Sequence, residues 1–230
     1  MDKSIPHLHK RRKGKTLADL IIFVLLFLPL TLHSATVDGM FYLKKIETRY
    51  AKVENFRAKF TQTSRAPGVV QNEQAKGIVY LRKDGKFRWD YEKPEVVLIV
   101  SDGQTLWIYQ AEDKQVMVDP RFGKKMKRFP YTFLSGMQNL HRDFTATIKK
   151  VGDRSVVLEL IPRKQLKDIR KMSLTLDKKT LFILKISWVT FQEVETSIGF
   201  DDIDITSKIP DSVFHFDPPE GVDIVRMDAQ

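Results

Sequence analysis

The first regular pattern of apolar residues in the chain predicts an amphipathic helix. Its apolar side chains recur at steps of three and four residues, which places them on one helical face: Met40, Leu43, Ile46, Tyr50 and Val53. Asp38 precedes them, and an aspartate there can accept a hydrogen bond from a backbone N–H of the first turn. We therefore expect a helix to begin directly after Asp38.

Beyond this helix, apolar and polar residues alternate with a period of two, which predicts β-strands. In "NFRAKFTQTS", Phe56, Ala58 and Phe60 fall on one face, and Arg57 and Lys59 fall on the other. Further strands are predicted at spacings of about ten residues, in "GIVYLRK", "KQVMVD", "FTATIKKV", "SVVLELIP", "MSLTLD", "LFILKISWVTF" and "VETSIGFDDID". The pattern indicates one mainly β domain of the α+β class, with a long antiparallel sheet and a few helices.

Two neighbouring strand segments are apolar on both faces. The segment "FRWDYEK" alternates, with Phe87 and Trp89 on one face, but 96–100 and 106–109 do not, and the hairpin turn "SDGQ" separates these two. Aromatic residues in strands usually pack in a core. A sheet with few helices has little to cover both faces, however, so the surplus indicates a concave apolar surface roofed by a helix.

The strand pattern is interrupted between Arg128 and Phe144. Pro130 can start a helix there, and one side of this helix would be apolar, with Phe133, Leu134, Met137 and Leu140. Gly136 lies in its middle and weakens it, as expected for a mobile or kinked element.

The N-terminus has the three parts of a secretory signal peptide. A basic region precedes 13 apolar residues, Leu20–Leu32, and the small residues Ser34 and Ala35 follow. Thirteen residues are too few for a membrane span, which needs about 20. We predict that residues 1–35 are a cleaved leader and that 36–230 form the exported domain; an uncleaved membrane anchor is the alternative.

Removal of this leader lowers the positive charge of the protein. Residues 1–35 hold six Lys/Arg and two Asp/Glu of the 39 and 29 in the chain, so 33 and 27 remain and the net charge falls from +10 to +6. The densest basic stretch, Arg121–Phe129, is interpreted as a solvated turn or a contact with a membrane surface. An exported protein rarely meets nucleic acid, so no nucleic-acid partner is expected.

The composition argues against cofactor and metal chemistry. The chain contains no cysteine, which excludes disulfides, thiolate metal sites and a cysteine nucleophile. His141 and His215 are 74 residues apart, and the cluster Asp201, Asp202 and Asp204 lacks the pattern of a calcium loop. We expect no catalytic residue, cofactor or metal. An envelope hydrolase with an unrecognised carboxylate pair remains the alternative of a different class.

Several sequence blocks resemble one family in their order along the chain. They are "VENFRAKFTQ", "GIVYLRKDGKFRWDYEKP", "VSDGQTLWIYQ", "FPYTFLSG" and "FHFDPPEGVDIV", and the similarity runs from about residue 37 to 225. They resemble the periplasmic outer-membrane lipoprotein carrier family, LolA. The resemblance implies a single curved antiparallel half-barrel of about eleven strands, closed by a helical lid over an apolar cavity. It also implies a periplasmic monomer that accepts acylated lipoproteins from an inner-membrane lipoprotein-releasing ABC transporter and passes them to an outer-membrane receptor.

The resemblance also implies roles for individual residues. Phe87 and Trp89 would line the acyl-chain cavity, together with Phe56 and Phe60. The lid would include Tyr131, Phe133, Leu134 and Met137.

One family feature is altered in this chain. Members commonly carry an arginine followed by proline in the turn before the "F-x-W" strand, and this arginine latches the lid's carbonyls. Lys83 and Asp84 stand there instead. Lysine keeps the charge but lacks the planar fork of donors, so Lys83 is a candidate latch, with a solvated turn residue as the alternative.

Related functions on the same fold are the remaining alternatives. The family's outer-membrane receptor, LolB, is itself a lipoprotein and needs an acylated cysteine, which this chain lacks. Another half-barrel that binds lipid or senses envelope stress would share the fold.

Overall fold

The structure is a computed structural model of the chain, and it describes residues 38–125, 140–164, 166 and 168–227. Contacts within the chain divide it between Thr36 and Val37, and every described residue belongs to the second unit. Within the described residues, no helix has the length and apolar character that a membrane crossing requires.

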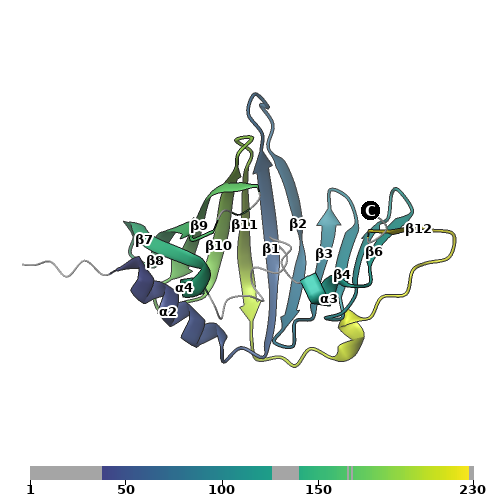
Figure 1. Cartoon of the computed structure of the whole chain (residues 1–230), viewed down its shortest axis with the longest axis horizontal. Coiled ribbons are helices and arrows are strands. Elements are labelled where there is room, and N and C mark those ends of the chain that lie inside the picture. Colours follow the sequence, from purple (N-terminus) through teal and green to yellow (C-terminus); the bar gives the residue numbers. More distant parts are fainter. Residues whose placement is uncertain (1–37, 126–139, 165, 167, 228–230) are drawn as a thin grey trace, which may run out of the picture. The chain divides into compact units, whose positions relative to one another are not determined.

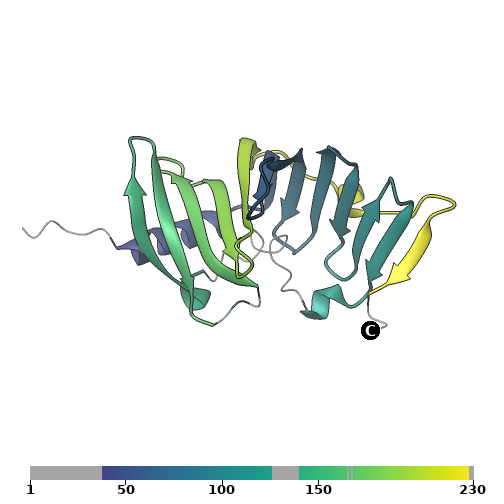
Figure 2. The same cartoon turned by 90° about the horizontal axis from the view of Figure 1, so that it is seen from above.

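Twelve strands form one sheet, which curves from one edge to the other (Figures 1 and 2). The spatial order is β12-β6-β5-β4-β3-β2-β1-β11-β10-β9-β8-β7. The strands are β1 (Asn55–Arg65), β2 (Glu73–Arg82), β3 (Phe87–Lys93), β4 (Val97–Ser101), β5 (Leu106–Gln110), β6 (Gln115–Asp119), β7 (Phe144–Val151), β8 (Ser155–Pro162), β9 (Ile169–Asp177), β10 (Ile183–Thr190), β11 (Glu195–Asp204) and β12 (Asp223–Arg226). The helical elements are α2 (Gly39–Tyr50), α3 (Phe122–Lys125), α4 (Leu140–Asp143) and the 3-10 turn η3 (Asp211–Phe214).

The mainly β class and the single curved sheet are confirmed. The antiparallel meander was expected to have about eleven strands, and the additional strand is β12. It pairs with the edge strand β6 in parallel, whereas every other pair is antiparallel. All four residues of β12 are exposed, and its two apolar residues, Ile224 and Val225, are adjacent, so no alternation of apolar and polar residues marks this strand.

Helix α2 begins where its sequence pattern predicts. The Asp38 carboxylate accepts a hydrogen bond from the Met40 N–H at 3.0 Å, and Leu43 and Ile46 are fully buried. Tyr50 ends the helix in the core, where its hydroxyl oxygen accepts a hydrogen bond from the Ile183 N–H at 3.1 Å. Burial raises the pKa of Tyr50 to about 12. The helix is thereby fixed to the sheet at its C-terminal end.

The apolar residues on the second face of β4 and β5 are covered by the chain's own C-terminal segment, residues 209–217. The Phe216 ring lies 5.8 Å from the Tyr109 ring and 6.5 Å from the Trp107 ring, between centroids, and Phe214 is 1% exposed. We expected few elements to cover both faces of the sheet, and this expectation needs correction here. The C-terminal segment therefore covers part of the outer face, at β4 and β5.

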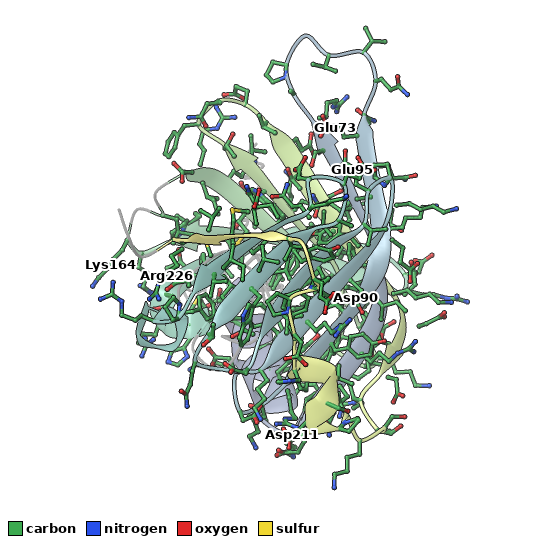
Figure 3. The ribbon with its side chains drawn as sticks, turned by 90° about the vertical axis from the view of Figure 1, so that its right-hand side faces the viewer. Glu73, Asp90, Glu95, Lys164, Asp211 and Arg226 are labelled. Carbon is green, nitrogen blue, oxygen red and sulfur yellow. The ribbon has the colours of Figure 1, made fainter. Side chains whose placement is uncertain are left out.

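Cations on β2, on β3 and in the turn between them hold this C-terminal segment in place. Asp211 of η3, labelled in Figure 3, accepts hydrogen bonds from Arg82 at 2.5 Å and from Lys86 at 2.7 Å. The Arg88 guanidinium donates to the Val213 carbonyl at 3.1 Å. Arg82 also lies over the Phe214 ring, 5.1 Å from its centroid. The segment is therefore anchored by charge at its start and by aromatic packing along its length.

The buried ring of Phe214 should contribute substantially to stability. Phe214→Ala removes a fully packed aromatic side chain and should lower the free energy of unfolding by about 3–5 kcal/mol. The measurement is denaturant unfolding. Phe191→Ala is the matched control, because Phe191 is 49% exposed, and should change stability by at most about 0.5 kcal/mol. Equal effects of the two substitutions would contradict the packing role of residues 209–217.

The ion pairs of Asp211 should make stability depend on pH. Hydrogen bonds from Lys86 and then Arg82 lower the pKa of Asp211 from its usual 3.8 to about 2. Because the folded-state pKa is depressed, the contribution is present above about pH 4 and is lost as pH falls toward 2. Asp211→Asn should therefore be less stable than wild type at pH 5–7, with a gap that closes in acid. The difference in stability between wild type and Asp211→Asn should also shrink in 1 M salt. A difference that does not change with pH would contradict this interpretation.

Candidate functional site

The four predicted cavity residues lie together on the inner face of the sheet. Each is buried, with at most 3% of its surface exposed: Phe56, Phe60, Phe87 and Trp89. Register explains the grouping, because Phe56 pairs with Leu81 of β2, and Leu81 pairs with Phe87 of β3. The next row is Ala58, Val79 and Trp89, and the third is Phe60, Gly77 and Tyr91. We call these three rows the aromatic wall.

A glycine at the centre of the third row allows the rings to meet. The Phe60 ring contacts the Trp89 ring at 5.0 Å and the Tyr91 ring at 4.9 Å, both edge-to-face. A Cβ at Gly77 would lie 2.9 Å from the Phe60 ring and 1.8 Å from the Asp90 carbonyl oxygen. Only a residue without a side chain fits between β1 and β3 at this position.

The aromatic wall continues beyond the strands on which it was predicted. Phe200 of β11 lies 6.3 Å from Phe56 and 6.4 Å from Trp89, and Phe122 of α3 lies 5.7 Å from Phe87, between ring centroids. No local pattern in the sequence places Phe200, Phe122 or Gly77 at the site. Phe200 is 140 residues away from Phe60 in the chain, and only strand pairing brings the two together.

The predicted lid residues lie outside the described residues. Tyr131, Phe133, Leu134 and Met137 fall between α3 and α4, in the stretch 126–139. Beyond it, Glu47 of α2 accepts hydrogen bonds from the backbone N–H and the Nδ1 of His141, at 2.7 and 2.8 Å. His141 therefore contributes to the packing of α4 against α2.

The candidate latch Lys83 has an acidic partner. Its ammonium donates to the Glu54 carboxylate at 2.6 Å, and its backbone N–H donates to the Glu54 carbonyl at 3.0 Å. A lid carbonyl would have to compete with this carboxylate. The latch role stays a prediction, and the alternative of a turn residue agrees with the Glu54 contact.

Two residues of the acidic cluster Asp201, Asp202 and Asp204 are engaged by other groups of the chain. Asp202 forms an ion pair with Lys59 at 2.7 Å, and Asp204 accepts hydrogen bonds from the backbone N–H groups of Thr206 and Ser207. Hydrogen bonds from these two residues hold the pKa of Asp204 far below its usual range. Within ranges 38–125 and 140–227, as far as the structure describes them, no group of three or more His, Cys, Asp or Glu is arranged to hold a metal ion.

Comparisons with known proteins agree with the resemblance. The model of the family "Outer membrane lipoprotein carrier protein LolA" matches residues 51–217. An outer-membrane lipoprotein carrier protein of Nitrosomonas europaea is 30% identical over 184 residues, covering 80% of this chain and 88% of the relative. That of Chromohalobacter salexigens is 30% identical over 207 residues, covering 90% and 95%.

A solved structure supports the fold. It is an uncharacterized conserved protein from Thermus thermophilus, with a TM-score of 0.53 and 16% sequence identity, over 80% of this chain and 96% of that one. The fold, the aromatic wall and the match over most of the sheet lead to one conclusion: this chain belongs to the LolA family of outer-membrane lipoprotein carrier proteins.

Proposed function

We propose that this protein is a periplasmic carrier that binds the acyl chains of lipoproteins and delivers them toward the outer membrane. The observation that carries the proposal is the aromatic wall, which is continuous over β11, β1, β2 and β3. The outer face of the neighbouring strands is covered by residues 209–217, so the inner face is the one suited to hydrocarbon. The names of the relatives describe carriers, which supports a role without catalysis.

The energetics of acyl burial limit how such a carrier works. A lipoprotein anchor with about three chains of roughly sixteen carbons would gain about 40 kcal/mol on complete burial, at about 0.8 kcal/mol per methylene. Noncovalent affinities do not exceed roughly 20 kcal/mol. The carrier must therefore cover the chains only in part, or oppose their binding with the work of opening its lid. Either device allows release.

The proposed function includes a route from export to delivery, and the affinity limit explains its loading and unloading steps. Residues 1–35 would direct export and be removed, and 36–230 would act in the periplasm as a monomer. An inner-membrane lipoprotein-releasing ABC transporter would supply the work of loading. An outer-membrane receptor needs only a higher affinity for the same chains to accept them. Tyr131, Phe133, Leu134 and Met137 would form the lid, and Lys83 its latch.

A charge on the aromatic wall should abolish acyl binding. Phe87 is fully buried on the inner face, and Phe87→Glu would place a carboxylate where hydrocarbon is proposed to lie. We expect at least about a tenfold loss of affinity for a fluorescent fatty acid, since an unpaired buried polar group costs more than about 1.4 kcal/mol. Circular dichroism should show that the sheet remains.

Two further variants give this test its controls. Phe87→Leu keeps an apolar surface and should retain binding, and Phe191→Glu changes an exposed ring outside the wall. If folded Phe87→Glu binds the fatty acid as wild type does, Phe87 is not part of the site.

The proposed cargo can be identified directly. Protein purified from periplasm should have lost about 35 N-terminal residues, the length of leader that the sequence predicts. Mass spectrometry should detect acylated proteins bound to it, and fewer on Phe87→Glu. An intact N-terminus in the membrane fraction would refute the export prediction, and isolation without any acylated molecule would refute the cargo.

A further inference from the structure

A cavity of about 750 Å³ lies beside the aromatic wall, toward the tip of the β1–β2 hairpin. This hairpin extends beyond the neighbouring strands (Figure 1), and Figure 3 shows Glu73 of β2 and Glu95 of the β3–β4 turn close together below its loop. Tyr91 and Gln62 line the cavity from the inner face of the sheet, Lys93 lines it from the end of β3, and Asn72 lines it from the loop of the hairpin. Its volume is in the range of sites for small ligands.

The inner face changes from apolar to polar where this cavity begins. Beyond the row Phe60–Gly77–Tyr91, the next residues on the same face are the paired Gln62 and Ala75, and then the paired Ser64 and Glu73. The Tyr91 hydroxyl donates to the Gln62 side-chain oxygen at 3.0 Å, so the last ring of the wall contacts the first amide of the cavity. A ligand that lies along the wall into this cavity must be apolar at one end and hydrogen-bonding at the other.

We propose that this cavity binds the polar head of the acylated ligand, namely its ester and amide groups and the first peptide units after the anchor. The proposal rests on the proposed function, which supplies the acyl chains. Four of the lining residues carry side-chain amides: Gln62, Gln71, Asn72 and Gln74. An amide donates and accepts hydrogen bonds, as a peptide group does. Such a site recognises backbone groups whatever side chains the cargo carries.

The charges in the cavity disfavour anionic phospholipids, which are also acylated molecules of a membrane. Lys93 is the basic residue among its lining residues, and Glu73 and Glu95 are the acidic ones, which gives a net charge of −1. A phosphate head needs an excess of donors with positive charge. The same cavity therefore accepts a neutral peptide head and repels a phosphate.

Replacing one side-chain amide tests recognition of the polar head separately from binding of the acyl chains. Gln62→Leu should weaken binding of a synthetic triacylated cysteinyl pentapeptide by about three- to tenfold, as expected for one lost hydrogen bond. Binding of a fluorescent long-chain fatty acid, which lacks the peptide, should stay within about twofold of wild type. Gln104→Leu is the matched control, because Gln104 is exposed in the β4–β5 turn at the opposite end of the strands. Fluorescence titration measures both ligands.

The outcomes of this experiment distinguish the two proposals. If wild type binds neither ligand, the proposed function fails. If wild type binds both and Gln62→Leu weakens both equally, or weakens neither, the head site is wrong and the proposed function stands.

Charge reversal tests the selectivity independently. Glu73→Lys with Glu95→Lys changes the charge of the lining from −1 to +3, and both residues are exposed. This variant should bind phosphatidylglycerol at least about tenfold more tightly than wild type relative to the acylated peptide. Asp217→Lys with Glu220→Lys makes the same change in total charge outside the cavity and should not shift the ratio. An equal shift in both variants, or wild-type protein that prefers phosphatidylglycerol, would overturn the proposal.

Discussion

The aromatic wall depends on one close approach of backbone, at Gly77. Phe60 on β1 and Tyr91 on β3 flank this glycine, and the Phe60 ring and the Asp90 carbonyl occupy the space that a side chain there would fill. The close approach at Gly77 allows two ring contacts of Phe60, both edge-to-face, one with Tyr91 and one with Trp89. The curved sheet thus presents large rings side by side on its inner face.

The second constraint is that a curved sheet must cover the face it does not use. Trp107 and Tyr109 are half-buried and would be more exposed to water without Phe216, which follows the short 3-10 helix η3. Arg82, Lys86 and Arg88 fix the start of this segment through Asp211 and Val213. Asp211 is largely exposed, so each of its ion pairs is weak singly, and the burial of the Phe214 ring adds stabilisation that does not depend on charge.

The sequence predicts what is local and periodic. The start of α2 after Asp38, the strand around Phe56 and Phe60, and the turn at Ser101–Gln104 all follow from spacing and capping, and the structure confirms them. The cavity residues Phe87 and Trp89 were selected through family resemblance and face periodicity, and their grouping on one face agrees with that selection. Their role toward acyl chains stays a prediction. Phe200, Gly77 and the cover by Phe216 depend on contacts between distant segments, which no local pattern carries.

The central claim is that hydrocarbon binds on the inner face, and tryptophan positions allow a direct measurement. Trp89 lies in the aromatic wall, and Trp107 packs against Phe216 on the outer face. Two variants, each retaining one of these residues as its only tryptophan, should be titrated with fatty acid brominated along its chain, since bromine quenches fluorescence only on near contact. The account predicts strong quenching of Trp89 and little of Trp107. Saturable binding that quenches Trp107 and leaves Trp89 unchanged would contradict it.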